Sequence, residues 1–186
     1  QGWSYFPGMN GFLYWNETFG ADSVQVLDFG IDWDCSGILY DNIGEDLNAY
    51  GGGITSMADA TIDPATGNMY LVYMSRVEGT SNTGDVNDFG AESYNDLFGV
   101  YTTDNGQTWS QPVNLTNSAE GGFENAHPSV AEEAVNGKIH VLWMRDDDPG
   151  NALEADPDPI KSNEVVYHAF DHTAVSYTHL RAHETS

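Results

Sequence analysis

An internal repeat constrains the fold of this sequence more than any other feature. The stretch TIDPATGNMYLVYMSR at residues 61–76 aligns with AEEAVNGKIHVLWMR at residues 131–145, so that Gly67 faces Gly137 at an offset of 70 residues. Upstream and downstream segments also match, with offsets of 70 and 68 residues respectively: MADAT with HPSVA, and NDLFGVY with NEVVYHA. Self-similarity at a fixed spacing indicates an architecture built by repeating one supersecondary unit.

Each unit contains a strand that is apolar on both of its alternating faces, at residues 69–75 and again at 139–144. Such a strand is predicted to be covered on both sides. Stacked sheets satisfy this requirement, as the blades of a β-propeller do, whereas a sandwich strand leaves one face polar. Gly, Asn, Asp and Ser interrupt every segment that could sustain a helical period. The sequence therefore predicts an all-β fold, a partial β-propeller of four-stranded antiparallel blades.

A tight hairpin is predicted where the first unit reads TTDNGQTW, at residues 102–109. Asn105-Gly106 tolerates the positive φ angles of such a turn, and the Asp104 carboxylate can accept backbone N–H groups across it. Flanking Thr hydroxyls can brace the turn, and a Trp can anchor it to the sheet. Five residues are thus expected to have a structural role: Thr102, Asp104, Gly106, Thr108 and Trp109.

The same string matches the pattern Ser/Thr-x-Asp-x-Gly-x-Thr-Trp. With the repeats around it, the sequence resembles the Asp-box, or bacterial neuraminidase repeat, β-propellers of the sialidase-like superfamily, over roughly residues 54–171. That family includes sialidases, other glycosidases and non-catalytic receptors such as sortilin. In the family the Asp-box is structural and lies away from the active site, so the resemblance implies the fold and leaves the activity open.

The repeat divides the chain into four parts. Residues 1–53 are expected to hold a partial preceding blade or edge, residues 54–116 a full blade with the Asp-box, and residues 117–174 a second, truncated blade. The last stretch, VSYTHLRAHETS at 175–186, resembles a translated sequencing adapter and is expected to be non-native. About two and a half blades form an open fragment, because a closed ring has roughly four to eight. The remaining blades of a parent propeller are therefore expected partners.

The amino-acid composition excludes further classes of partner. The chain has 29 acidic and 5 basic residues and a formal net charge of -24 at pH 7, which disfavours nucleic acid as a partner. It has no apolar run long enough for a membrane-spanning helix, so no membrane insertion is expected. The single cysteine, Cys35, excludes an internal disulfide framework within this stretch. The family resemblance implies a secreted or cell-surface bacterial protein.

Successive turns of an up-and-down blade alternate between the two sides of the disc, which separates the predicted hairpin from the long loops. The loops at 77–94 and 146–162 and the connection at 117–126 share the opposite side. Long loops at one rim of a rigid scaffold commonly carry binding. The second loop could supply oxygen ligands to Ca²⁺, with a solvated charged loop as the alternative. Its candidate ligands are Asp146, Asp147, Asp148, Asp156 and Asp158.

Three basic side chains are candidate ligand-binding residues on the loop side: Arg76, Arg145 and His127. The arginines leave their strands at nearly equivalent positions, and the resemblance to sialidases implies a clamp on a substrate carboxylate. The alternative is that both pair with neighbouring Asp residues such as Asp146, in ion pairs of small energetic value. His127 opens the innermost strand of its unit. The sialidase pattern is incomplete, because Tyr5-Phe6-Pro7-Gly8 lacks the Arg-Ile-Pro signature and no Tyr-Glu nucleophile pair can be assigned.

Together these features favour an extracellular sialidase-like propeller module that binds a glycan, a protein or Ca²⁺ through its acidic loop side, with no catalytic set evident. The alternative is an exo-acting glycoside hydrolase of the sialidase type, of which the chain is an incomplete catalytic domain. Whether the protein is an enzyme is left open, and Ca²⁺ is the one cofactor considered.

Overall fold

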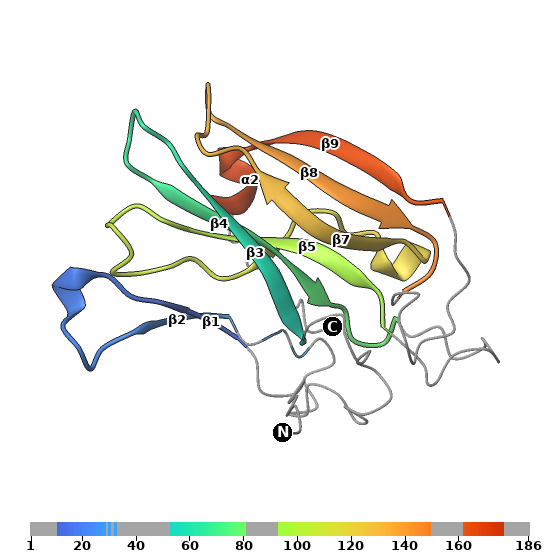
Figure 1. The fold of residues 1–186 in the computed structure, drawn as a ribbon, viewed down its shortest axis with the longest axis horizontal. Helices are drawn as coiled ribbons and strands as arrows, with labels where there is room; N and C mark the ends of the chain where they lie inside the picture. Colours follow the sequence, from blue (N-terminus) through green and yellow to red (C-terminus); the bar gives the residue numbers. More distant parts are fainter. Residues whose placement is uncertain are drawn as a thin grey trace, which may run out of the picture.

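The computed structural model describes residues 11–28, 30, 32, 53–80, 93–149 and 162–176, and these form three antiparallel sheets (Figure 1). The all-β class predicted from the sequence is confirmed, and none of the described sheets closes on itself. None of the helices in these ranges has the length and apolarity needed to cross a membrane. The elements are β1 (Phe12–Tyr14), η1 (Glu17–Phe19), β2 (Gln25–Asp28), β3 (Thr55–Ile62), β4 (Met69–Arg76), β5 (Asn95–Thr102), β6 (Val113–Asn114), η2 (Ala119–Gly121), β7 (Glu124–Val130), β8 (Lys138–Asp146), β9 (Glu164–Asp171) and α2 (His172–Ser176).

The repeat in the sequence is also a repeat of strand register. The sheets have the orders β1-β2, β3-β4-β5-β6 and β7-β8-β9. Met74 pairs with Leu97 in the second sheet, and Met144 pairs with Val165 in the third. These two pairs are related by the same offsets, 70 and 68 residues, that align the two units in the sequence.

Both units carry the same β-bulge in their first strand. The register shifts once between β3 and β4 and once between β7 and β8. Inside each bulge a non-glycine residue has a positive φ, 52° at Met57 and 54° at His127. The Val130 N–H donates to Asp59 Oδ2 at 2.8 Å, which ties the first bulge to the neighbouring sheet. Equal strain at equivalent positions shows that the two units share their backbone geometry.

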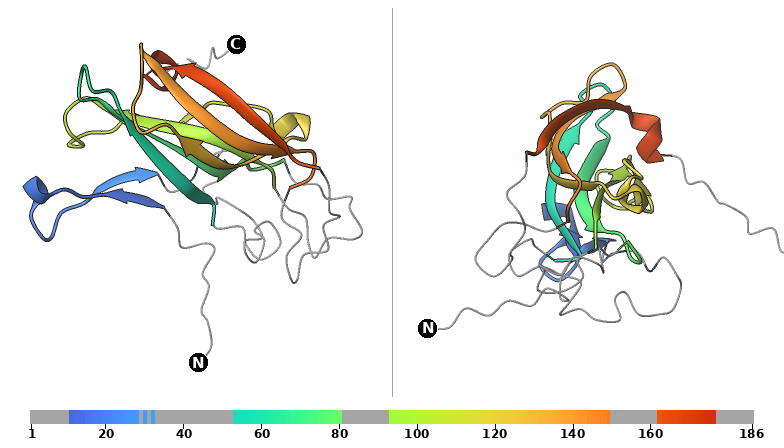
Figure 2. Two further views of the ribbon diagram at one scale, coloured as in Figure 1. Left: turned by 45° about the horizontal axis from the view of Figure 1, so that its top comes forward. Right: turned by 90° about the vertical axis from the view of Figure 1, so that its right-hand side faces the viewer.

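The sheets stack face to face (Figures 1 and 2). One apolar cluster lies on each side of the four-stranded sheet. The front face of this sheet, turned towards β7–β9, contributes Tyr70, Val72, Met74 and Leu97. Its back face, turned towards β1–β2, contributes Tyr73, Phe98 and Val100. The prediction that the apolar strand is covered on both sides is confirmed for β4.

In the three-stranded sheet only the back face is covered. That face meets the front face of the four-stranded sheet through Ile139, Val141, Trp143 and Phe170. The alternate side chains of β8, including Leu142 and Met144, are exposed. Within the described residues, one face of β8 is covered as predicted and the other is not.

The connections alternate between the two edges of the sheets, as the repeat predicts. Met69 pairs with Thr102 at one end of the β4-β5 ladder, and Arg76 pairs with Asn95 at the other. The turns at Gly67 and Gly137, with φ angles of 76° and 71°, therefore share an edge with the 102–109 hairpin. The ends of β4 and β8 lie at the opposite edge (Figure 1).

After β9 the chain forms the short helix α2, where a hairpin would follow in the repeat. The His172 N–H donates to the Gly137 carbonyl at 2.9 Å. Val175 is buried, and its Cγ1 lies 3.0 Å from the position that a Cβ at Gly99 would occupy. Val175, the first residue of the stretch expected to be non-native, thus packs on β5. The origin of that stretch stays a prediction, and residues 177–186 lie outside the described ranges.

Side chains of the 102–109 hairpin hydrogen-bond within their own turn. Asp104 Oδ1 accepts the Thr108 N–H at 2.9 Å, and Asp104 Oδ2 accepts the Thr108 hydroxyl at 2.6 Å. Thr102 Oγ1 accepts the Gly106 N–H at 3.0 Å and donates to Asp104 Oδ1 at 2.7 Å. Asn105 and Gly106 have φ angles of 59° and 81°. The turn is held by these bonds, which use both oxygens of a single carboxylate.

The β1–β2 hairpin packs on this turn. Tyr14 and Trp109 make an edge-to-face contact with ring centroids 5.3 Å apart. Asn16 Nδ2 donates to the Asn105 carbonyl at 3.1 Å. A Cβ at Gly106 would come within 2.0 Å of Tyr14 Cε1, so only glycine allows this approach.

Gly106→Ala is expected to lower the free energy of unfolding more than Gly67→Ala does. Both variants place a methyl group at a positive φ, which costs about 1–2 kcal/mol. Only the Gly106 variant also collides with the Tyr14 ring, because nothing lies within 4 Å of the Gly67 position. Denaturant unfolding measures the difference. Equal losses in the two variants would show that Tyr14 is not seated on the hairpin.

Asp104 is expected to make the stability of the hairpin dependent on acid. Hydrogen bonds from Thr108, and then from Thr102, lower the pKa of Asp104 to about 2. A folded-state pKa below the ordinary value gives a stabilisation that is complete above the ordinary value and is lost as the pH falls towards the folded-state value. Asp104→Asn should therefore lower Tm at pH 7, and the difference from the parent chain should shrink between about pH 4 and pH 2.

Asp22→Asn, in the exposed turn before β2, removes the same charge and serves as the control. Its Tm should stay close to that of the parent chain over the same pH range. A gap between Asp104→Asn and the parent chain that does not narrow in acid would contradict the role given to the Asp104 carboxylate.

Candidate functional site

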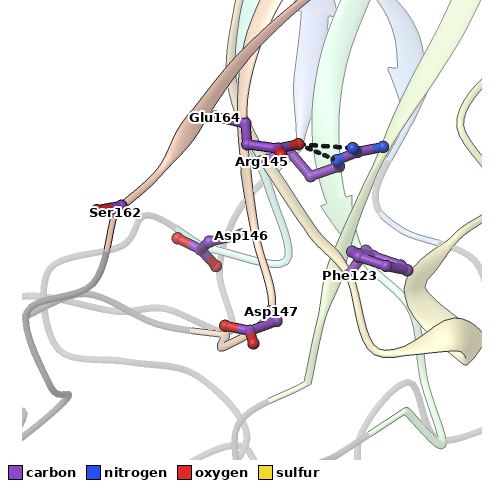
Figure 3. A pocket seen from close by; sticks show the side chains of 6 residues that line it. All are labelled: Phe123, Arg145, Asp146, Asp147, Ser162 and Glu164. Atoms are coloured by element: carbon purple, nitrogen blue, oxygen red, sulfur yellow. Dashed lines mark hydrogen bonds and ion pairs between the residues drawn. The ribbon is translucent and has the colours of Figure 1, made fainter.

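A pocket of about 260 Å³ opens at the edge opposite the Gly67 and Gly137 turns, where β8 ends and β9 begins (Figure 3). Its position on the loop side agrees with the side that turn alternation selects. The side chains around it combine one aromatic ring, one guanidinium, three carboxylates and one hydroxyl. They are Phe123, Arg145, Asp146, Asp147, Ser162 and Glu164.

Arg145 is held in this pocket by two side chains. Its Nη2 and Nε donate to Glu164 Oε2 at 2.6 and 3.2 Å, across the last register pair of the β8-β9 ladder. Its guanidinium carbon also lies 5.3 Å from the centroid of the Phe123 ring, in a cation–π contact. Both Arg145 and Glu164 keep solvent-exposed surface. The guanidinium is thus pre-oriented and still accessible to a ligand.

Phe123 is an exposed aromatic residue that sequence reasoning missed. It follows η2 in the predicted connection at 117–126 and belongs to no motif. The one local signal is its position after Gly121-Gly122, where Gly122 takes a φ of 75° and redirects the chain. An aromatic side chain that follows such a turn and remains exposed is a common feature of binding surfaces.

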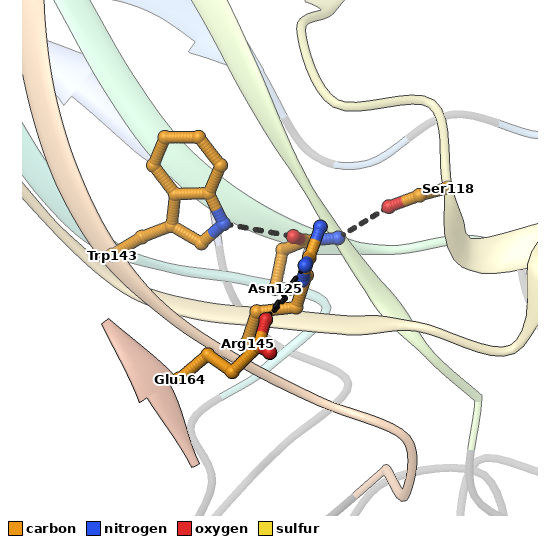
Figure 4. Close-up of polar contacts among 5 residues, drawn as sticks. All are labelled: Ser118, Asn125, Trp143, Arg145 and Glu164. Carbon is orange, nitrogen blue, oxygen red and sulfur yellow. Dashed lines mark hydrogen bonds and ion pairs between the residues drawn. The ribbon is translucent and has the colours of Figure 1, made fainter. Parts of the chain in front are cut away.

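A buried hydrogen-bond network fixes the connection that carries Phe123 (Figure 4). Trp143 Nε1 donates to Asn125 Oδ1 at 2.8 Å, and Asn125 Nδ2 donates to Ser118 Oγ at 2.8 Å. Asp96 Oδ1 accepts from Asn125 Nδ2 at 3.1 Å and from the Ser118 N–H at 3.0 Å. Because Trp143 belongs to the core, the network couples the packing of the sheets to the position of the aromatic ring at the pocket.

Arg76, the repeat counterpart that sequence reasoning grouped with Arg145, is buried. Its side chain is 2% exposed, and its Nη1 donates to the Ser93 carbonyl. It does not line the pocket at Arg145. Arg145 pairs with Glu164 and Arg76 lies inside, so neither arginine has Asp146 as an ion-pair partner in the described structure.

The two arginines also differ by one residue in register. Arg145 pairs with Glu164, and by the two offsets the equivalent pair in the first unit is Ser75 with Asp96. Arg76 is therefore equivalent to Asp146 and not to Arg145. Because side chains alternate along a strand, one residue moves a side chain to the other face of its sheet. Arg76 points with Met74 towards the neighbouring sheet, and Ser75, the equivalent of Arg145, is buried on the other face. Arg76 is therefore inaccessible because both faces of the four-stranded sheet are covered.

Arg76 compensates a buried carboxylate. Glu124 on β7 is buried and accepts hydrogen bonds from the backbone N–H and the side-chain amide of Asn95. Burial raises the pKa of Glu124, and the charge of Arg76 opposes this shift. Asp146, the register partner of Glu124, adds to the increase. The buried guanidinium thus favours the charged form of Glu124 across the space between two sheets, and a role in ligand binding stays a prediction.

The proposed calcium ligands are described in part. Asp146 Oδ1 accepts the Asp148 N–H at 3.1 Å, and the Asp147 carbonyl accepts the Tyr94 hydroxyl at 3.3 Å. In the described part of the chain, no three or more acidic, His or Cys side chains are arranged to hold a metal ion. Asp156 and Asp158 lie outside the described residues, as does Cys35, so the calcium site stays a prediction.

His127 lies in the β7 bulge, where its side chain is exposed. It does not line the pocket at Arg145, so the structure does not bring the three predicted basic residues into one site.

No family model matches the sequence, and no curated protein shows significant similarity to it.

Removing Arg76 is expected to destabilise the protein strongly. In Arg76→Met the buried Glu124 carboxylate loses the positive charge that favours its ionised form, so the loss should exceed the ~1 kcal/mol or less expected for an exposed ion pair. Adding Glu124→Gln should recover much of this loss. Because the folded-state pKa of Glu124 is raised, the loss in Arg76→Met should grow as the pH rises above the ordinary pKa of a glutamic acid side chain.

Arg145→Met is the matched control, because it breaks an ion pair that is exposed. It should cost about 1 kcal/mol or less in free energy of unfolding. Denaturant unfolding of the two single variants and the double variant provides the measurement. A small, pH-independent loss in Arg76→Met would refute the counter-charge role.

Proposed function

We propose that this chain is part of an extracellular, sialidase-like β-propeller module that binds a neutral glycan in the pocket at Arg145. The propeller is supported by the strand register and bulge that recur in the four-stranded and three-stranded sheets, and by sheets that stack front face to back face. The parallel bridge between Ile62 and Glu133 also supports it, because the innermost strands of neighbouring blades run side by side in the same direction. The 102–109 hairpin has the hydrogen-bond pattern that the Asp-box residues suggest.

The binding proposal rests on one observation: the accessible ring of Phe123 lies beside the fixed guanidinium of Arg145 and several carboxylates. A sugar ring has an apolar C–H face that can pack on an aromatic side chain such as Phe123. Its hydroxyls both donate and accept hydrogen bonds, so they can use the carboxylates and the guanidinium together. A pocket of about 260 Å³ is suited to one or two sugar units of a longer glycan.

The charge of the pocket favours a neutral glycan over a sialylated one. Arg145 is the one basic residue among those that line it, and it is already paired with Glu164. Asp146 and Asp147 add further negative charge at the rim. A ligand carboxylate would have to approach this excess of negative charge, which costs electrostatic free energy.

A glycan array followed by calorimetry tests the proposal. Neutral oligosaccharides are expected to bind more tightly than their sialylated counterparts. Phe123→Ala should weaken binding by at least about tenfold, since truncating an aromatic contact residue commonly costs more than 1 kcal/mol. Arg145→Met should weaken it as well, because Glu164 and the Phe123 ring lose the group between them.

Lys138→Met is the matched control. Lys138 pairs with Asp171 at 2.6 Å at the other end of the β8-β9 ladder, so the variant removes an equivalent ion pair away from the pocket. Its glycan affinity should equal that of the parent chain. An unchanged affinity in Phe123→Ala would contradict the proposed site, and hydrolysis of a fluorogenic sialoside would favour the glycoside hydrolase instead.

A further inference from the structure

Two exposed asparagines that precede a glycine lie at the tips of tight hairpin turns. Asn105 and Gly106 have φ angles of 59° and 81°, and Asn136 and Gly137 have φ angles of 53° and 71°. Positive φ at both central residues is typical of a type I′ turn. A third Asn-Gly pair, at residues 10–11, begins outside the described residues. The two described turns share their central sequence and nearly share their backbone, so their chemistry can be compared directly.

An asparagine that precedes a glycine can lose its side-chain amide to the main chain. The glycine nitrogen gives its proton to a base in the solvent and attacks the asparagine Cγ. The N–Cγ bond forms, the Cγ–Nδ2 bond breaks, and the amide nitrogen leaves as ammonia. Water then opens the five-membered succinimide at either carbonyl, which gives aspartate or isoaspartate. Glycine favours the attack because it has no Cβ to hinder it.

This reaction requires a rotation of the central peptide of the turn. Ring closure places the glycine nitrogen and the asparagine Cβ on the same side of the Cα–C bond, which in an L-residue corresponds to the ψ of about −120° found at the first central residue of a type II′ turn. In a type I′ turn that ψ is about +30°. The two turn types differ by a flip of the central peptide, and φ of the asparagine stays positive in both. Deamidation therefore depends on whether this peptide is free to flip.

In the 102–109 hairpin, both ends of the central peptide are held by hydrogen bonds. The Gly106 N–H donates to Thr102 Oγ1 at 3.0 Å. The Asn105 carbonyl accepts from Asn16 Nδ2 at 3.1 Å. A flip reverses the directions of this N–H and this carbonyl, so it breaks both bonds.

The central peptide of the other turn is free at both ends. Within the described residues, no group accepts the Gly137 N–H and none donates to the Asn136 carbonyl. The two bonds that close the turn join the N–H and carbonyl groups of Val135 and Lys138, both at 3.0 Å, and a flip leaves them intact. The His172 N–H donates to the Gly137 carbonyl at 2.9 Å, but that carbonyl belongs to the following peptide and does not rotate.

We propose that Asn136 is a deamidation site of this protein, and that the hydrogen bonds of the 102–109 hairpin protect Asn105 from the same reaction. Isoaspartate at residue 136 carries the main chain through Cβ and so lengthens a two-residue turn. The proposal does not depend on glycan binding, because both turns lie at the edge opposite the Arg145 pocket.

Peptide mapping by mass spectrometry, on protein kept at mildly alkaline pH, measures both sites in one sample. In the folded protein, Asn136 should deamidate at least about tenfold faster than Asn105. A tenfold difference in rate corresponds to about 1.4 kcal/mol, and a flip at Asn105 breaks two hydrogen bonds. In denaturant the two rates should converge, because the Asn-Gly sequence is the same. Equal rates in the folded protein would overturn the proposal, as would a difference that persists in denaturant.

Two variants test the protection of Asn105 separately. Thr102→Val removes the acceptor of the Gly106 N–H, and Asn16→Ala removes the donor to the Asn105 carbonyl. Each should speed deamidation at Asn105 and leave the rate at Asn136 unchanged, so that Asn136 is the internal control. Circular dichroism checks that each variant folds. A rate at Asn105 that stays at the parent value in Asn16→Ala and in Thr102→Val would contradict the protective role of these bonds.

Discussion

The face-to-face packing of the four-stranded sheet on the three-stranded sheet is the interaction on which the rest of the structure depends. Val72 and Val141 are fully buried in this contact, and each such side chain contributes about 1.5–3 kcal/mol through removal of apolar surface from water. Trp143 belongs to the same cluster, and its indole N–H also holds Asn125. The packing of the two sheets therefore sets the position of the connection that carries Phe123. The geometry of the pocket at the loop edge therefore depends on the packing of the core.

Arg76 and Arg145, at the loop end of the two packed sheets, have different roles. Arg76 lies between the sheets and favours the charged form of Glu124, whereas Arg145 lies at the open edge and keeps solvent access. The two arginines are not at equivalent repeat positions, and both faces of the four-stranded sheet that carries Arg76 are covered. Similar residues in a repeat can therefore serve stability in one unit and recognition in another.

Much of the fold was predictable from the sequence, because apolar strands and turn glycines recur at a fixed spacing. Two-sided apolar strands require stacked sheets, and the glycines at 67 and 137 require tight turns at one edge. Less of the site was predictable. Phe123 belongs to no motif, and the burial of Arg76 depends on a register that only pairing across strands defines. The exposure of the β8–β9 front face could not be predicted either, because its apolar residues are of the kind that usually form a core.

Side-chain contacts between the two larger sheets can be observed directly by NMR. In a sample with labelled Val, Ile and Met methyl groups, methyl–methyl NOEs report distances shorter than about 5–6 Å, the range of direct side-chain packing. Stacking of front face on back face predicts cross-peaks that join the methyl groups of Val72 and Met74 to those of Ile139 and Val141. A folded chain with dispersed methyl signals but no cross-peaks between these two groups would contradict the stacked arrangement.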